Sequence, residues 1–246
     1  MSDDPVARVS ALIPAAGSGE RLGMGPKALL TLGGISLLER SIAAFAGIAS
    51  EIIVALPSDV TLELPEGVRR VEGGATRQQS VYHLLIAATG TTVLIHDAAR
   101  PFLHRSVIER VLSATLETGA ATAALPASDT LILEAGGDWG SVLEREQIRA
   151  VQTPQGFNRA LLLEAHGRAR LEGIAATDDA GLVARLGQRV ALALGDERLF
   201  KVTRPGDWAL AEAFASVWDA ENVVVGARHA SHQCAQGATP LRVGGL

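Results

Sequence analysis

Short apolar runs alternate with amphipathic stretches along most of the chain. Runs typical of buried strands occur at 9–13, 51–57, 68–71, 92–96 and 120–126. Apolar residues at helical spacing predict helices at 36–45, 76–88, 105–116, 159–171 and 178–186. This alternation predicts an α/β fold, a Rossmann-like and mostly parallel sheet with helices on both faces. The loops that follow its strands should meet at one edge, where ligands bind.

The pattern changes between residues 128 and 151. Three apolar residues from Leu131 are followed by a Gly-Gly-Asp turn and then by a charged, alternating stretch. This predicts a β-hairpin arm with too few apolar residues for a core of its own. Strands at 189–194 and 199–203 and a closing helix at 207–218 complete the pattern. We therefore expect one domain over 1–222, with the arm at about 128–151, and a loosely ordered tail over 223–246.

Composition narrows the class of protein. The chain has 246 residues, 48% of them hydrophobic, and a formal net charge of −5, which argues against a general nucleic-acid binder. No apolar run reaches membrane-spanning length, and the acidic start lacks the apolar region of a signal peptide. One cysteine cannot form a disulfide framework. We expect a cytoplasmic protein with neither nucleic-acid nor membrane partners.

A glycine-rich loop follows the first predicted strand. It contains Gly17 and Gly19, continues through Arg21 and ends at Lys27. Glycines let the backbone wrap closely around a ligand with its N–H groups inward, and the two cations add positive charge. This pattern suits phosphoryl or nucleotidyl transfer. The spacing matches neither the dinucleotide fingerprint nor a Walker loop. The alternative is an ordinary glycine-rich turn between strand and helix.

Three further segments carry candidate chemistry. Asp97 directly follows a predicted buried strand, where a carboxylate can hold Mg²⁺, although a helix cap or turn is the alternative. The turn at Gly73-Gly74 can bind a base or ribose through its backbone, or it can be a plain left-handed turn with Thr76 as N-cap. The segments 153–155 and 201–205 each end a predicted strand, where Lys201 can reach a phosphate or can be a solvated surface lysine.

These segments form a specific, ordered set of motifs. They are P-A-A-G-S-G-E-R-L-G…P-K at 14–27, G-G-A-T-R-Q-Q-S at 73–80, H-D-A-A-R-P at 96–101, S-D-T at 128–130, T-P-Q-G-F at 153–157, T-D-D-A at 177–180 and K-V-T-R-P at 201–205. By these motifs the chain resembles the 2-C-methyl-D-erythritol 4-phosphate cytidylyltransferase family over roughly residues 8–218. The resemblance implies transfer of CMP from CTP to the polyol phosphate in the non-mevalonate isoprenoid pathway. It also implies Mg²⁺ or another divalent cation, and release of pyrophosphate.

The resemblance further implies a role for each matched residue. Arg21, Lys27 and Lys201 would be catalytic, acting on the triphosphate and the five-coordinate phosphorus, and Asp97 would bind the metal. The nucleotide would be bound by Ala15, Ala16, Gly17, Gly19, Gly74, Arg77 and Ser80. The methylerythritol phosphate would be bound by Arg100, Thr130, Arg145, Thr153 and Thr177. The arm would form a homodimer.

Other functions remain open at this point. Ribitol 5-phosphate cytidylyltransferases share most of these motifs and differ in the acceptor. Sugar-1-phosphate and molybdopterin nucleotidyltransferases are disfavoured by the T-P-Q and K-V-T-R-P motifs. A non-catalytic nucleotide-binding module would not need Arg21, Lys27, Asp97 and Lys201 together. Ala75 stands where the family often has an acidic residue, which leaves base selectivity open.

Overall fold

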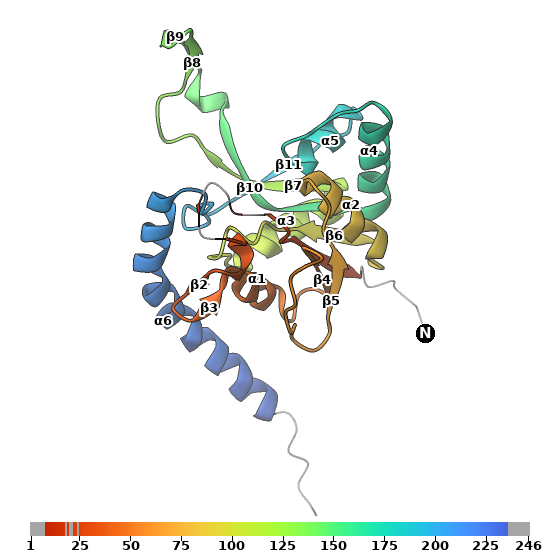
Figure 1. The fold of residues 1–246 in the computed structure, drawn as a ribbon, viewed down its shortest axis with the longest axis vertical. Helices are drawn as coiled ribbons and strands as arrows, with labels where there is room; N and C mark the ends of the chain where they lie inside the picture. Colours follow the sequence, from red (N-terminus) through yellow and green to blue (C-terminus); the bar gives the residue numbers. More distant parts are fainter. Residues whose placement is uncertain (1–7, 18, 20–21, 24, 236–246) are drawn as a thin grey trace, which may run out of the picture.

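The core of the protein is a seven-stranded sheet (Figure 1). The computed structural model describes residues 8–17, 19, 22–23 and 25–235, and for residues 223–235 it describes the backbone alone. The strand order is β11-β7-β10-β6-β1-β4-β5. These strands are β1 (Val9–Pro14), β4 (Glu51–Leu56), β5 (Val68–Glu72), β6 (Thr92–Ile95), β7 (Ala120–Pro126), β10 (Arg149–Asn158) and β11 (Ala191–Leu194).

The sheet is mostly parallel, as predicted. β1 pairs in parallel with both β4 and β6, and β4 with β5, while β10 alone among the described strands of this sheet runs antiparallel to its two neighbours. The carboxyl ends of β1, β5 and β6 therefore lie at one edge. The loops that follow these strands carry the glycine-rich segment, the Gly73-Gly74 turn and Asp97, so the topology brings three of the motifs together.

Helices cover both faces of the sheet, which confirms the predicted layers. One core cluster joins the sheet to α1 (Leu37–Phe45) and α3 (Arg105–Thr118), and a second joins it to α2 (Arg77–Ala87), α4 (Arg159–Leu171) and α5 (Asp179–Arg185). β1, β4 and β6 are buried over most of their length, because both faces of a covered parallel sheet must be apolar. The fold also contains two short 3-10 helices, η1 (Lys27–Leu29) and η2 (Arg145–Gln147). A small hairpin pairs β2 (Thr31–Leu32) with β3 (Ile35–Ser36).

The C-terminal helix α6 (Pro205–Ala235) packs against β2 and against loops that follow strands of the sheet. Its Trp208 and Trp218 share an apolar cluster with Leu22 of the glycine-rich loop and Val202. On α6, Asp219 also accepts a hydrogen bond of 2.8 Å from the buried guanidinium of Arg40 on α1. Helix α6 therefore supports two of the loops that form the candidate site.

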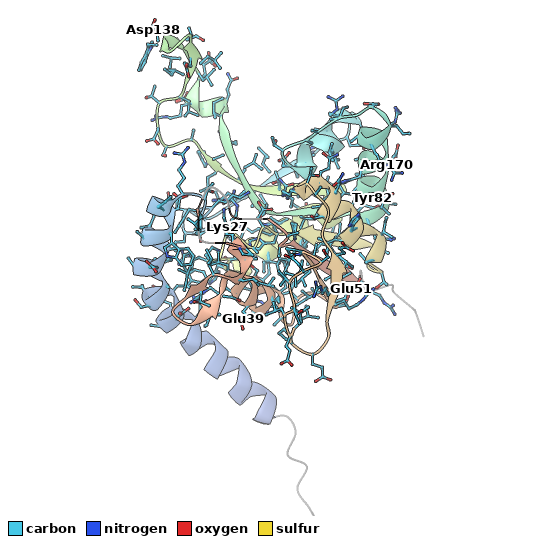
Figure 2. The ribbon with its side chains drawn as sticks, viewed as in Figure 1. Lys27, Glu39, Glu51, Tyr82, Asp138 and Arg170 are labelled. Carbon is cyan, nitrogen blue, oxygen red and sulfur yellow. The ribbon has the colours of Figure 1, made fainter. Side chains whose placement is uncertain are left out.

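The arm projects away from the body, with Asp138 at its tip (Figures 1 and 2). It contains β8 (Ile132–Ala135) and β9 (Asp138–Val142), paired antiparallel. Both turn glycines, at 136 and 137, have positive φ, as the predicted hairpin turn requires. Leu133, Trp139 and Val142 are 57%, 71% and 58% exposed. The predicted hairpin is confirmed, and it presents apolar side chains that the described part of this chain leaves uncovered.

Three local predictions were wrong. Residues 199–203 form a loop rather than a strand, since the backbone bond from Val202 to Ala99 links them to another loop and not to the sheet. The segment 153–155 lies inside β10, at a register shift, and not at a strand end. Helix α6 begins at Pro205 and continues to Ala235, well past the predicted end at 218. Within the expected tail, residues 223–235 thus continue α6, and residues 236–246 lie outside the described part.

Within the described residues, no helix combines the length and apolar character needed to cross a membrane.

Candidate active site

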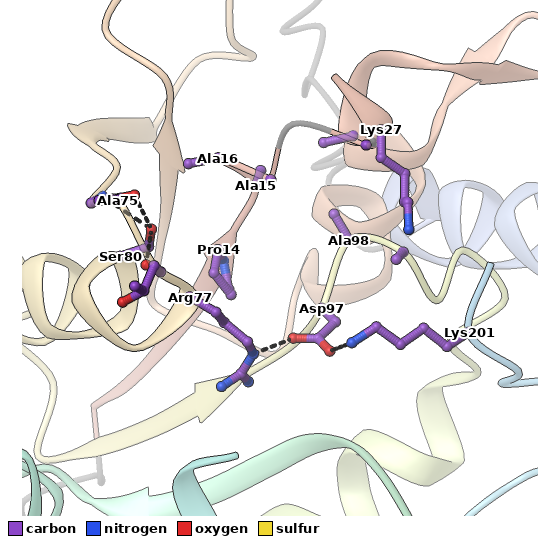
Figure 3. A pocket seen from close by; sticks show the side chains of 16 residues that line it. Pro14, Ala15, Ala16, Lys27, Ala75, Arg77, Ser80, Asp97, Ala98 and Lys201 are labelled. Carbon is purple, nitrogen blue, oxygen red and sulfur yellow. Dashed lines mark hydrogen bonds and ion pairs between the residues drawn. The ribbon is translucent and has the colours of Figure 1, made fainter. Parts of the chain in front are cut away.

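A cavity of about 580 Å³ opens where the loops after β1, β5 and β6 meet (Figure 3). Its volume lies within the usual range for small-molecule sites. Lys201 reaches it from the loop before α6. The predicted residues that line it are Ala15, Ala16, Gly17, Gly19, Lys27, Gly74, Arg77, Ser80, Asp97 and Lys201. The structure thus assembles the predicted nucleotide, metal and catalytic residues that it describes. Arg21 lies outside the described residues.

One wall of the cavity is the turn at Gly73-Gly74. Neither glycine has positive φ, so this is not the plain left-handed turn considered above. Glycine is needed because backbone and side chains crowd it: a Cβ on Gly73 would stand 2.2 Å from the Cβ of Ala16. Ser80 accepts a hydrogen bond of 3.0 Å from the Gly74 N–H, and Thr76 caps α2, the one part of that alternative that the structure bears out. The turn therefore holds the backbone near Ala15 and Ala16 at a fixed, close distance.

The glycine-rich loop forms the opposite wall. Gly19 has φ +74°, and a Cβ there would stand 2.0 Å from the Gly25 carbonyl oxygen, so only glycine fits. The loop ends in η1, from which Lys27 reaches the cavity and donates a hydrogen bond of 2.9 Å to the Val202 carbonyl. The two lysines of the site therefore belong to segments that are tied directly to each other.

Asp97 lies between two cations. Its Oδ1 accepts from Arg77 Nε at 2.9 Å, and its Oδ2 from Lys201 Nζ at 2.7 Å (Figure 3). Burial alone would raise the pKa of Asp97, but the charges of Arg77 and Lys201 outweigh burial and hold this pKa well below its usual range. The helix-cap alternative is wrong, because the next helix begins at Arg105 with His104 as its cap. Asp97 does begin a turn, since its carbonyl oxygen accepts from the Arg100 N–H at 2.9 Å, but its side chain is left to face the cavity. Asp97 is therefore a carboxylate at the cavity wall.

Behind Asp97 lies a buried layer that fixes its loop. Thr153 is 4% exposed and its hydroxyl accepts from the Asp97 N–H at 3.1 Å and contacts His96 Nδ1 at 3.0 Å. Burial lowers the pKa of His96 to about 4, so this imidazole is neutral at pH 7. His96 is thus a structural residue that packs behind the Asp97 loop. Thr153 supports the loop from behind in this state, and its assignment as a polyol-phosphate ligand stays a prediction.

The remaining predicted polyol-phosphate residues lie outside the cavity. Thr130 and Arg145 are exposed on the arm, and Thr177 is exposed just before α5. Arg100 is half-buried, with two hydrogen bonds to backbone oxygens, and its Nε has no partner among the described residues; burial lowers its pKa. The described chain alone therefore does not bring these four residues to the cavity.

Sequence reasoning missed one contact of the site. Arg77 also donates from Nη1 to Oδ2 of Asp179 at 2.8 Å, and Asp179 is 1% exposed. The signal was present in the T-D-D-A motif, but the spacing of residues 77 and 179 gives no hint that they meet.

The donor set fits a magnesium ion. In the described part of the chain, no group of three His, Cys, Asp or Glu side chains is placed to hold a metal by itself. Asp97 offers one carboxylate at the cavity, and Mg²⁺ commonly takes one or two carboxylates with the rest of its ligands from phosphates and water. Asp97 together with a bound triphosphate would suit it, once Oδ2 is released by Lys201.

Comparison with known proteins agrees with this geometry. Residues 9–216 match the family model of 2-C-methyl-D-erythritol 4-phosphate cytidylyltransferase (IspD). The chain is 60% identical to the protein of that name from Deinococcus radiodurans over 208 residues, which cover 84% of this chain and 89% of the relative. It is 40% identical over 249 residues to the bifunctional enzyme IspD/IspF of Sphingopyxis alaskensis, covering 97% of this chain and 62% of that one.

A solved structure shares the fold. The crystal structure of 2-C-methyl-D-erythritol 4-phosphate cytidylyltransferase from Thermus thermophilus superposes with a TM-score of 0.78 at 50% identity, covering 85% of this chain and 99% of that one. On sequence and on structure, the chain belongs to the 2-C-methyl-D-erythritol 4-phosphate cytidylyltransferase family.

Proposed function

We propose that this protein transfers CMP from CTP to 2-C-methyl-D-erythritol 4-phosphate and releases pyrophosphate. The observation that carries this proposal is the cavity in which Lys27, Lys201 and Asp97 face two glycine turns. A phosphate oxygen of the acceptor attacks the α-phosphorus of CTP, and the bond to the bridging α–β oxygen breaks. The electron pair leaves with pyrophosphate, so no co-reactant is needed.

The two lysines supply charge where the reaction develops it. The phosphorus becomes five-coordinate and its outer oxygens gain negative charge, while the leaving pyrophosphate gains charge as well. Lys27 and Lys201 stand on neighbouring loops that are bonded to each other at the cavity, so both ammonium groups are at the site where that charge develops. Arg21, by resemblance, acts with them on the triphosphate.

A divalent cation fits the same scheme. Asp97 would hold it together with the triphosphate oxygens, and the cation would neutralise charge on the phosphates. Because Lys201 Nζ occupies Oδ2 of Asp97 in this state, we infer that CTP draws Lys201 away toward its phosphates. The ammonium is suited to this exchange, since its side chain is 38% exposed and flexible.

The base would be bound by the other wall. Ala15, Ala16, Gly74 and Ser80 all line the cavity. The Gly74 N–H already donates to Ser80, and the remaining backbone N–H and C=O groups there suit recognition of a flat base. Ala75 lines the same wall and adds no charge. Base selectivity would therefore come from the backbone and not from an acidic side chain.

The acceptor phosphate would be bound across a homodimer. Thr130 and Arg145 lie on the arm, outside this chain's own cavity, and the arm presents the exposed apolar side chains of Leu133, Trp139 and Val142. A twofold partner would cover that surface and would place its own Thr130 and Arg145 at this cavity. A cytoplasmic location stays a prediction from the sequence.

The main alternative acceptor is ribitol 5-phosphate. The family model and the relatives named above all favour methylerythritol phosphate. The test measures pyrophosphate release with CTP, ATP, GTP and UTP against each polyol phosphate. We expect release with CTP and methylerythritol phosphate, and little with the other pairs. Preference for ribitol 5-phosphate would contradict the proposed acceptor, and CTP binding without turnover would favour the non-catalytic module.

A further inference from the structure

A line of polar side chains in contact with one another runs from the interior of the protein to the cavity. His166 Nε2 lies 2.9 Å from Oδ1 of Asp179, and Oδ2 of Asp179 lies 2.8 Å from Nη1 of Arg77. Arg77 Nε then donates to Asp97, whose other oxygen meets Lys201. Figure 3 shows the last three of these side chains in a row at the cavity. The contacts thus connect α4 to the residues proposed to handle the metal and the phosphates.

The inner end of this line does not touch the cavity. His166 is 3% exposed and Asp179 is 1% exposed, and neither lines the cavity. Burying a carboxylate is costly unless it is paired, so Asp179 must make good contacts where it lies. The backbone N–H of Asp179 donates to Gln155 Oε1 at 3.1 Å, which fixes the start of α5 on β10. Asp179 is therefore held in a defined place by both backbone and side chain.

The contact with Asp179 decides which way the guanidinium of Arg77 faces. An arginine side chain has many rotamers, and with Asp97 as its sole partner it could pair through any of its nitrogens. With Nη1 held by Asp179, Nε meets Oδ1 of Asp97 and leaves Oδ2 toward Lys201.

We infer that Asp179, held by His166, is a positioning residue for the reaction: it fixes Arg77, and through Arg77 it presents Oδ2 of Asp97 to the cavity. This inference rests on the proposed function, since it assigns Oδ2 to the metal and triphosphate. It also gives Arg77 a role in orienting the carboxylate, in addition to lining the nucleotide site. The T-D-D-A motif would then act on the reaction by orienting Arg77, without contacting the substrate.

The test is a double-mutant cycle on kcat. We expect Asp179→Asn to lower kcat about 10-fold with a KM for CTP within about 3-fold of wild type. In an Arg77→Gln background, the same Asp179→Asn change should alter kcat by less than about 2-fold, because its partner is already lost. Equal losses of kcat in both backgrounds would overturn the inference, since Asp179 would then act independently of Arg77.

A binding measurement that does not depend on catalytic turnover accompanies the double-mutant cycle. Calorimetry of CTP binding at several Mg²⁺ concentrations, without acceptor, should show that Asp179→Asn requires several-fold more Mg²⁺, while metal-free CTP binds as to wild type. An unchanged Mg²⁺ requirement would contradict the positioning role. The matched control is Glu51→Gln, which likewise replaces a mostly buried carboxylate with an amide. The Glu51 side chain is 13% exposed and lies at the start of β4, at the edge of the sheet away from the cavity. This variant should leave kcat and the Mg²⁺ requirement unchanged.

Variants of His166 keep the inference testable if Asp179→Asn does not fold. His166→Gln retains an N–H donor for Asp179 and should keep most of kcat, whereas His166→Leu should lose about 5-fold. Equal kcat for these two variants would contradict the role given to His166. Wild-type enzyme that makes no CDP-linked product would refute the proposed function. An active wild type with an equally active Asp179→Asn would refute this inference alone.

Discussion

Lys27 and Val202 join two motifs that stand far apart in the sequence. The Lys27 ammonium donates a hydrogen bond of 2.9 Å to the Val202 carbonyl oxygen, across 175 positions. The neighbouring residue, Lys201, reaches Asp97. The glycine-rich loop, the H-D-A-A-R-P loop and the K-V-T-R-P loop are thus linked before any substrate binds.

Lys27→Ala should impair turnover far more than CTP binding. The ammonium meets charge that grows in the transition state, so we expect kcat to fall on the order of 10²-fold or more while the Kd for CTP changes little. Arg21→Ala should behave alike by resemblance. Steady-state kinetics and calorimetry on the same preparations measure both quantities. Near-normal kcat for Lys27→Ala would remove this residue from the catalytic set.

Asp97→Asn should abolish Mg²⁺-dependent activity. The amide keeps the shape but loses the charge that attracts the cation, and it leaves Arg77 and Lys201 without their shared carboxylate. We therefore also expect some loss of thermal stability, which circular dichroism melts would record. Activity that survives at ordinary Mg²⁺ concentrations would show that the cation is held elsewhere.

Glu51 should make folding sensitive to acid. Burial alone would raise its pKa, but hydrogen bonds from Ser10, Thr89 and Gly90 outweigh burial and lower the pKa to about 2. Since the folded pKa lies below the ordinary value of 4.5, this stabilisation is complete above pH 4.5 and is lost as the pH falls toward 2.

Glu51→Gln measures this contribution. We expect it to lower the free energy of unfolding by roughly 2 kcal/mol at pH 7, and by much less near pH 2, where Glu51 itself becomes protonated. Urea melts of both proteins across this pH range give the difference. A difference that stays constant with pH would mean that the charge of Glu51 is not the source of the stabilisation.

The proposed shared site predicts complementation between two inactive variants. Lys27→Ala damages the cavity, and Arg145→Ala damages the arm that would serve the partner's cavity. Random re-pairing of an equal mixture makes about half of the dimers mixed, and each mixed dimer has one intact site, so roughly a quarter of wild-type activity should return. Native mass spectrometry confirms the exchange. No recovery after confirmed exchange would show that each site is built from one chain.

The layers of the fold could be predicted because the strands that carry the site are short, apolar and separated by amphipathic helices. The hairpin could be predicted from its glycine turn. The segment 199–203 could not, because its alternating pattern serves a loop: Leu199 and Val202 are buried under α6 and α3 without joining the sheet. The pattern of apolar residues in a short segment indicates which side chains are buried. Burial alone does not distinguish a strand from a packed loop.

The sequence motifs predicted which residues form the site, but they predicted only part of how those residues contact one another. Strand ends at one edge placed Asp97 near the glycine-rich loop, as parallel topology requires. The bond between Arg77 and Asp179 could not be foreseen, since it depends on how α5 docks on β10 through Gln155. The position of the arm relative to a second chain likewise depends on the interface between two chains. The hydrophobic pattern of one chain does not define that interface.

The central claim is that the CMP group moves from CTP to methylerythritol phosphate at this cavity. The most direct measurement follows CTP with a radiolabelled α-phosphate, with Mg²⁺ and methylerythritol phosphate, for wild type and Lys27→Ala. The account predicts that wild type transfers the label to a cytidine-diphosphate-linked polyol while unlabelled pyrophosphate is released, and that Lys27→Ala does so on the order of 10²-fold more slowly. Label that remains in CTP, appears as free CMP, or is transferred equally fast by Lys27→Ala would contradict it.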